Sequence, residues 1–202
     1  MHWIDPACLP ETKGVVDRFL INPHGAADGL LLKDGKEVHF PPHMSGPILA
    51  AVKPGDPVKV RGLRPRGVDM VVAVSIQAGE APAIVDNGPQ KKEGPHKGHD
   101  HKGDKHTKPE QHKHTDVQGV VTHVLHGPKG EKRGALLEDG IIVWLPPHAA
   151  ESLHDTLAPG RKLAARGVAL TNALGTVVDA HEIGVSLATL LSVEPKKHDQ
   201  AA

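Results

Sequence analysis

Six histidines lie within 19 residues of one another: His96, His99, His101, His106, His112 and His114. Neutral imidazole is a good ligand for zinc, nickel and copper(II). A flexible tract can bring three or four such rings onto one ion, and Asp100 and Asp104 could add oxygen ligands. The spacing therefore indicates a segment that binds or buffers a divalent metal. The alternative is a solvated spacer of biased composition. Under either interpretation, the protein requires no cofactor.

These histidines belong to a segment, residues 86–116, that consists mainly of Lys, His, Asp, Gly and Pro with almost no apolar residue. Such a segment cannot bury enough surface to offset the entropy of an ordered chain, which predicts a disordered linker. The regions on either side have ordinary composition. The expected order is an N-terminal extension, a first domain, the linker, a second domain and a polar tail, at 1–13, 14–85, 86–116, 117–193 and 194–202.

The two flanking regions are copies of one module. Gly14-Val15-Val16 recurs as Gly119-Val120-Val121, and this offset of 105 continues without a gap over about 66 residues. Chance does not produce such a series, so the sequence indicates a duplication. The further matches include Leu31-Leu32 with Leu136-Leu137, Asp34-Gly35 with Asp139-Gly140, Pro41-Pro42-His43 with Pro146-Pro147-His148, and Arg61-Gly62 with Arg166-Gly167.

Each module has the pattern of a small all-β domain. Val15–Ile21 is rich in β-formers, and Asp34-Gly35 is a favoured two-residue turn between two further strands. A short helix follows at Ser45–Val52, with Ser45 as its cap, and two more strands complete the module at 58–61 and 68–76. The order is three strands, a helix and two strands. In the second copy we also expect a short helix at 186–193 that covers an edge of the module.

This order resembles the OB-fold, a five-stranded Greek-key barrel with a helix between its third and fourth strands. The segments VKPGDPVKVRG and LAPGRKLAARG look like the usual entry into the fourth strand of that fold. The resemblance covers both repeats and implies two OB-like barrels joined by the histidine-rich linker. An SH3-like barrel is the alternative, but the helix within the module favours the OB-fold.

A two-residue hairpin loop would pair Leu31 with Val38 and Leu30 with His39. The core face is then expected to carry Leu31, Val38 and Phe40, and the outer face Leu30, Leu32, Glu37 and His39, with equivalent residues in the second copy. In OB-folds, the outer face of the second and third strands binds nucleic acid or oligosaccharide. His39 and Trp144 hold the positions on this face where a base could stack.

The resemblance therefore favours a non-enzymatic module that binds single-stranded DNA or RNA weakly. Its phosphate contacts would come from Lys59, Arg61, Arg64, Arg66 and Arg166. The first copy has eight Lys and Arg against six acids over residues 14–79, a net +2, whereas the second has six against seven over 119–184, a net −1. The electrostatic case for nucleic acid thus rests on the first copy.

An adaptor protein is a further hypothesis, because the outer faces are apolar enough to contact each other, a second copy or a protein partner. His43 and His148 follow Pro-Pro and are interpreted as turn residues rather than ligands. Nothing in the sequence resembles a nucleophile with its base, and the single cysteine, Cys8, excludes an internal disulfide. With no apolar stretch near 20 residues and no apolar core at the N-terminus, we expect a soluble, cytoplasmic protein that does not contact a membrane.

Overall fold

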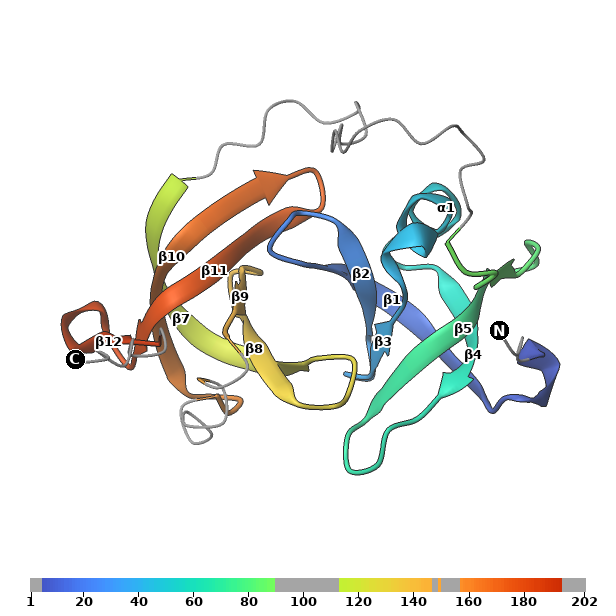
Figure 1. The fold of residues 1–202 in the computed structure, drawn as a ribbon, viewed down its shortest axis with the longest axis horizontal. Helices are drawn as coiled ribbons and strands as arrows, with labels where there is room; N and C mark the ends of the chain where they lie inside the picture. Colours follow the sequence, from blue (N-terminus) through green and yellow to red (C-terminus); the bar gives the residue numbers. More distant parts are fainter. Residues whose placement is uncertain (1–4, 90–112, 147–148, 150–156, 194–202) are drawn as a thin grey trace, which may run out of the picture.

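The computed structural model describes residues 5–89, 113–146, 149 and 157–193, and these form two β-barrels that lie side by side (Figure 1). The first barrel contains strands β1 (Glu11–Ile21), β2 (Ala27–Leu32), β3 (Glu37–His39), β4 (Pro57–Leu63) and β5 (Met70–Ala78). A short strand β6 (Ile84–Val85) pairs with β5. Short 3-10 helices lie at Pro6–Cys8 and Pro42–Met44, and helix α1 (Ser45–Ala51) follows the second of them.

The strand pairing is that of an OB-fold. Strand β1 pairs antiparallel with both β2 and β4, β2 pairs with β3, and β4 pairs with β5. The barrel closes through a parallel pairing of β3 with β5, in which Val38 lies opposite Val71. Helix α1 lies between the third and fourth strands, as the sequence predicts.

The second barrel repeats this topology with β7 (Lys113–His126), β8 (Lys132–Leu137), β9 (Ile142–Trp144), β10 (Lys162–Asn172) and β11 (Gly175–Gly184). It closes by the parallel pairing of β9 with β11. The residues that correspond to α1, 150–156, lie outside the described residues, and Ala149, the copy of Met44, is buried. The prediction of two five-stranded barrels is therefore confirmed.

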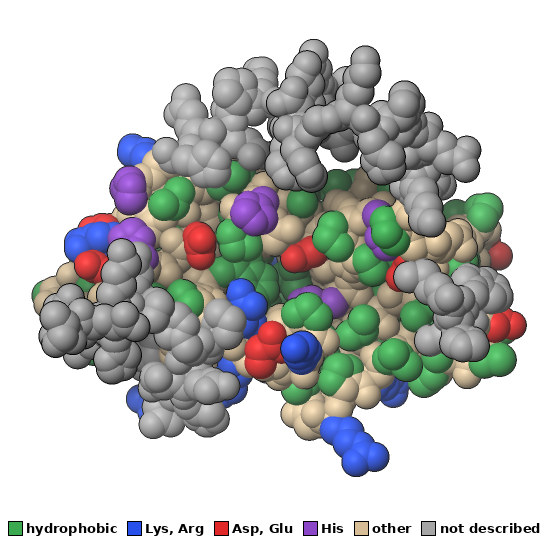
Figure 2. All heavy atoms as spheres, viewed as in Figure 1, with side chains coloured by type: hydrophobic (Ala, Val, Ile, Leu, Met, Phe, Trp, Pro, Cys, Tyr) green, Lys and Arg blue, Asp and Glu red, His purple; other side chains and the backbone are tan. Residues whose placement is uncertain are grey.

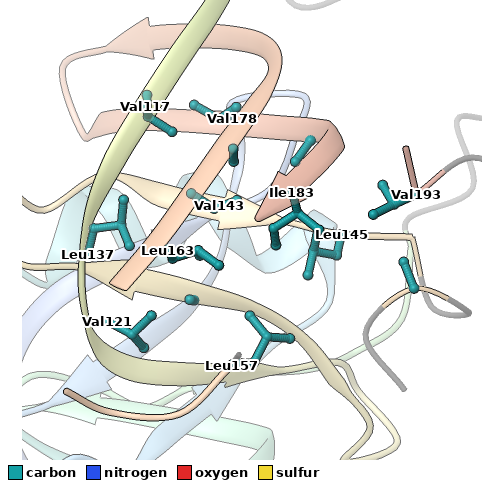
Figure 3. Close-up of a cluster of buried hydrophobic side chains, with 14 of the residues drawn as sticks. Val117, Val121, Leu137, Val143, Leu145, Leu157, Leu163, Val178, Ile183 and Val193 are labelled. Atoms are coloured by element: carbon teal, nitrogen blue, oxygen red, sulfur yellow. The ribbon is translucent and has the colours of Figure 1, made fainter. Parts of the chain in front are cut away.

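Each barrel has its own apolar core, as the alternation of side chains along a strand requires. In the second barrel the side chains of Leu137, Val143, Leu163 and Val178 converge on the interior, and all four are almost completely buried (Figure 3). The first barrel is filled by the equivalent strands, with Leu32, Val38 and Phe40 among its buried residues. Repetition of the core in both copies explains why the duplication is so clear in the sequence.

The hairpin between β2 and β3 differs from the predicted two-residue turn. Gly35 N–H donates to Leu32 O and Leu32 N–H donates to Lys36 O, so the loop contains three residues. Only Gly35 has a positive φ, at +86°, as in a type I turn followed by a bulge. The extra residue shifts the register, and Leu30 instead of Leu31 lies opposite Val38. Leu30 and Leu32 therefore belong to the core, and Leu31 belongs to the outer face.

Three further predictions need correction. Met44 rather than Ser45 is the N-cap residue of α1, and its side chain makes no capping hydrogen bond. The expected C-terminal helix is instead a 3-10 turn (Leu187–Thr189) followed by β12 (Leu191–Ser192), which pairs with β11. Strand β7 begins at Lys113, inside the range assigned to the linker, because Lys113 to Thr115 pair with β10.

No helix in the described residues is long and apolar enough to cross a membrane.

Candidate binding site between the barrels

The outer faces of the two predicted hairpins pack against each other. Strands β2 and β3 of the first barrel face β8 and β9 of the second (Figure 1), and hydrophobic side chains gather between the two halves (Figure 2). We call the buried residues that join the barrels the interbarrel cluster: Leu20, Ile21, Leu31, Leu125, Leu136, Ile142, Trp144, Leu170 and Val177. The apolar outer faces therefore cover one another within a single chain.

The two barrels meet through equivalent surfaces. A Cβ added to Gly35 would contact the ring of His123 at 3.4 Å, and one added to Gly140 would contact Arg18 at 3.1 Å. Gly140 is the copy of Gly35, and His123 is the copy of Arg18, at the offset of 105. Such reciprocal contacts are the property of a twofold interface, here between two copies in one chain.

One side of this pseudo-twofold interface is apolar, and two hydrogen bonds join the barrels there. The Trp144 indole Nε1–H donates to the Ile21 carbonyl oxygen at 2.7 Å, and both residues are buried. Asn172 adds a hydrogen bond from its side-chain amide to the Gly25 carbonyl oxygen, at 2.8 Å. A buried Trp usually needs a partner for its N–H, and here the partner belongs to the other barrel.

The opposite side carries a buried polar group in place of these apolar residues. Glu37 contacts His39 on its own strand, with Oε2 3.1 Å from Nε2, and it contacts His126 across the interface, with Oε1 2.6 Å from Nδ1. The copies of Glu37 and His39 are Ile142 and Trp144. Burial raises the pKa of Glu37, but hydrogen bonds from His126 and His39 outweigh it, and the pKa is lowered overall.

A cavity of about 320 Å³ opens where the barrels meet. Its lining comes from both copies, and four equivalent pairs contribute to it: Asn22 with Gly127, Pro23 with Pro128, Asp28 with Arg133, and His39 with Trp144. His126, Phe40, Pro41, Pro42 and Val72 complete the wall. This size is at the lower end of the range for small-molecule sites in proteins.

Asp28 is the most unusual group in this cavity. Its Oδ1 atom is buried and has no hydrogen-bond partner among the described residues. Burial raises the pKa of Asp28, and the neighbouring His39 and a hydrogen bond from Asn22 only partly oppose that effect. A buried acceptor without a donor is costly, so such a group in a cavity is a candidate for ligand contact.

The structure places the predicted stacking residues, His39 and Trp144, in the floor of this cavity and not on an open sheet face. Their exposed fractions are 7% and 6%. A strand of nucleic acid laid across the hairpins would have to displace the other barrel. The sequence analysis identified these two positions but did not identify Asp28, Arg133 and His126 as candidate site residues. The signal that could have identified them was their position in the repeat alignment.

The predicted phosphate-contacting residues lie elsewhere. Arg61 bonds Glu11 at 2.8 Å, and Arg64 donates to the Thr12 hydroxyl at 2.6 Å. Lys59 and Arg66 are exposed. In the second barrel, Arg166 is held between two carboxylates, Asp116 at 2.7 Å and Glu182 at 2.8 Å. The basic residues of the first barrel therefore follow β4 and the loop after it, whereas Arg166 stands apart in an acidic setting.

Of the six predicted metal ligands, the structure describes only His114, which lies in β7 with its ring 5.9 Å from that of His181. His96, His99, His101, His106 and His112 lie outside the described residues. Within the described ranges, no group of three His, Cys, Asp or Glu residues is arranged to hold a metal ion. His43 of the Pro-Pro-His motif bonds Asp86 at 2.7 Å, which joins the start of the helical segment to the chain beyond β6.

Comparison with known proteins gives no family for this chain. No protein-family model matches it, and no curated protein matches it. Among solved structures, it is similar to the wild-type single-stranded DNA binding protein from Thermus aquaticus, with 15% identity and a TM-score of 0.27, over 86% of this chain and 90% of that one. A deletion mutant of that protein gives 15% identity and a TM-score of 0.28, over 93% and 96%. Both TM-scores are below 0.5, so these two structures carry no argument about the fold. The OB-like assignment rests on the strand pairing described above.

Proposed function

We propose that this chain is a non-enzymatic double-barrel binding protein whose first barrel binds single-stranded nucleic acid weakly along β4 and the loop that follows it. The supporting observation is the line of basic side chains Lys59, Arg61, Arg64 and Arg66 along one strand and one loop. Lys13 of β1 lies directly opposite Lys59 in the strand pairing and extends this strip. We call these five residues the basic strip.

The position of the basic strip fits the way in which the barrels are joined. The hairpin faces that usually bind ligands in OB-folds are covered by the interbarrel cluster. The first-barrel residues of the interbarrel cluster come from β1 and β2. Strand β4, which lies between β1 and β5, contributes none of them. Nucleic acid on the strip would therefore leave the interface between the barrels intact.

The expected mode of binding is electrostatic. Phe40 and Trp144 are both buried, so neither offers a base-stacking surface on the strip. Arg61 and Arg64 already bond acceptors on β1, which a phosphate would have to replace or share. Binding through Lys and Arg to phosphates has little sequence preference and weakens steeply with salt.

The test is fluorescence polarisation with a labelled oligothymidylate of about 16 nucleotides, measured over a series of salt concentrations. The variant replaces three residues of the strip by those that occupy the same positions in the second barrel: Lys59→Ala, Arg64→Ala and Arg66→Thr. Position 59 is an exposed strand position and positions 64 and 66 are exposed positions in the loop after β4, so the variant is expected to fold. Loss of three contacts should lower the slope of log affinity against log salt by about 2.

The matched control removes three positive charges from exposed positions away from the strip, Lys33→Ala, Lys53→Ala and Lys162→Ala. It should retain most of the affinity and most of the salt slope. Equal losses in the two triple variants would contradict the strip as a site, because they would show a response to net charge alone. Absence of binding by the unaltered chain at low salt would refute the proposed function.

A further inference from the structure

We propose that the cavity between the barrels binds a small zwitterion, of which a free α-amino acid is the simplest example, with its ammonium group at Asp28 and its carboxylate at Arg133. This site is separate from the basic strip and goes beyond the proposed function. The inference rests on the positions of the two charged residues, on their surroundings and on the symmetry of the interface.

Both charged residues occupy β-bulges. In the first barrel Leu20 pairs with Gly29 and Ile21 pairs with Ala27, which leaves Asp28 as the additional residue on β2. In the second barrel Leu125 pairs with Gly134 and His126 pairs with Lys132, which leaves Arg133 in the same position on β8. A bulge redirects the side chain of its additional residue, and bulges are frequent beside functional sites. The cavity is thus lined by two redirected side chains of opposite charge.

The symmetry of the interface explains why the opposite charges of Asp28 and Arg133 are informative. Position 133 is the copy of position 28, so a perfect repeat would place identical groups at these two positions of the cavity lining. Such a cavity would suit a ligand with two identical ends. The chain instead carries a carboxylate at one position and a guanidinium at the other, which suits a ligand with one cationic and one anionic end.

Neither side chain is neutralised by the other. The structure contains no ion pair between Asp28 and Arg133, which lie in its described part, although both line the same cavity. The Arg133 Nε–H donates to the Leu145 carbonyl oxygen at 3.2 Å, which fixes the guanidinium while its remaining N–H groups stay available to an anion. Asp28 lines the cavity, where its carboxylate would receive an ammonium group, and its Oδ1 atom has no donor among the described residues.

The remaining walls suit an apolar side chain. Phe40 and Trp144 form a buried floor, whereas Pro42 and Pro128 are exposed at the rim, so the cavity is open to solvent on one side. Aromatic and proline surfaces favour an aliphatic or aromatic group between the two charged ends. An amino acid with a large apolar side chain therefore matches the volume, the walls and the charges together.

Trp144 provides a reporter within the cavity. The chain has two tryptophans, so a Trp3→Phe variant leaves Trp144 as the only source of indole emission. The experiment titrates this full-length variant with phenylalanine, with phenethylamine, which lacks the carboxylate, and with 3-phenylpropionate, which lacks the amine. Phenylalanine should change the emission at the lowest concentration, and each of the other compounds should need about ten- to a hundred-fold more, as expected for the loss of one charged contact.

Two substitutions assign the ends of the ligand. Asp28→Asn should weaken phenylalanine and phenethylamine by about ten-fold or more and leave 3-phenylpropionate unchanged. Arg133→Gln should weaken phenylalanine and 3-phenylpropionate and leave phenethylamine unchanged. Lys129→Gln, at an exposed position outside the cavity lining, is the control for loss of charge and should bind all three compounds normally.

The pattern of the two variants separates recognition from misfolding, because a misfolded chain would lose all three compounds at once. Equal weakening of all three compounds in both variants would overturn the proposal. It would also be overturned if none of the three changed the emission at millimolar concentration. Tighter binding of adenosine monophosphate than of phenylalanine would overturn the assignment to a zwitterion.

Discussion

Glu37 of the first barrel accepts two hydrogen bonds from His126 of the second, one from the backbone N–H at 3.0 Å and one at the ring Nδ1 at 2.6 Å. The carboxylate also contacts His39 on its own strand, and Glu37 is 4% exposed. This carboxylate therefore joins the barrels on one side of the pseudo-twofold interface, opposite the hydrogen bond between Trp144 and Ile21.

The first prediction concerns acid sensitivity. The pKa of Glu37 is lowered in the folded chain below its usual value of 4.5, because the hydrogen bonds from the two histidines outweigh its burial. A lowered folded-state pKa stabilises the fold above the unfolded-state pKa, and that stabilisation is lost as the pH falls through the folded value. Glu37→Gln should lower the free energy of unfolding at neutral pH by about 1–3 kcal/mol.

Urea unfolding of both chains from about pH 3 to about pH 7 measures this effect. This range extends to both sides of the unfolded pKa of a glutamate. The two curves of stability against pH should approach each other as the pH falls, because the unaltered chain loses what the variant already lacks. Parallel curves over this whole range would show that the carboxylate adds no charge-dependent stability to the interface.

The second prediction concerns the apolar side of the interface. Trp144→Phe keeps an aromatic ring in the interbarrel cluster but removes the N–H that bonds the Ile21 carbonyl oxygen. The buried carbonyl then lacks its donor, which should cost about 1–3 kcal/mol, whereas Trp144→Ala should cost about 3–5 kcal/mol because it also leaves a cavity. Denaturant unfolding monitored by circular dichroism provides both values. A loss below a few tenths of a kcal/mol in the Phe variant would mean that water replaces the indole N–H.

Much of this arrangement could be predicted from the sequence because duplication reveals which features a module needs. The repeated glycines, prolines and apolar positions placed the strands of both barrels and the helix of the first. The outward orientation of Glu37, His39, Ile142 and Trp144 was also correct, because strand β3 and its copy alternate regularly. The packing of the apolar outer faces against each other was one of the alternatives that the sequence raised.

The cavity could not be predicted, because its geometry depends on small departures from regular pairing. A third residue in the hairpin loop exchanged the faces of Leu30 and Leu31, and the sequence Asp-Gly suits a two-residue or a three-residue loop equally well. The bulges at Asp28 and Arg133 likewise have no distinct sequence pattern. Only the coordinates show that these two positions line one cavity.

The third prediction tests how closely β8 and β9 approach. A Cβ on Gly134 would lie 2.2 Å from the Val143 carbonyl oxygen and 3.0 Å from the Trp144 ring. Gly134→Ala should therefore displace Trp144 and destabilise the chain by about 1–3 kcal/mol, the usual cost of overpacking. Gly46 in helix α1 has no atom within 4 Å of its added Cβ, so Gly46→Ala should be neutral or stabilise the chain by up to about 1 kcal/mol. Equal melting temperatures for the two variants would contradict the close contact.

The fourth prediction concerns the histidine-rich segment. Isothermal titration with nickel and zinc should show binding by the full chain and a strong reduction in a variant in which His96, His99, His101, His106 and His112 are replaced by Ser. This variant keeps the length of the segment and leaves β7, which begins at Lys113, intact. Imidazole nitrogen is the ligand that these metals share, so loss of five rings should remove most of the heat. The same heat for both chains would place any metal site elsewhere and would refute the metal-buffering alternative.

The fifth prediction separates stability from recognition at Asp28. Burial raises the pKa of this carboxyl above its usual value of 3.8, so the folded chain binds the proton more tightly than the unfolded chain does. A raised folded-state pKa means that folding loses stability as the pH rises from the unfolded value through the folded one. Asp28→Asn cannot ionise, so it should raise the free energy of unfolding at neutral pH on the order of 1 kcal/mol.

The comparison of Asp28→Asn with the unaltered chain at pH 7 and again near the unfolded pKa of about 3.9 makes the sign testable. The gain should shrink at the lower pH, because the raised pKa makes the aspartate of the folded chain more protonated there than that of the unfolded chain. A variant that gains stability while it loses the response of Trp144 to phenylalanine would identify Asp28 as a residue that the fold retains for binding. A variant that is less stable at both pH values would instead make Asp28 a structural acceptor of the bulge, since its only contribution would then be to the packing of β2.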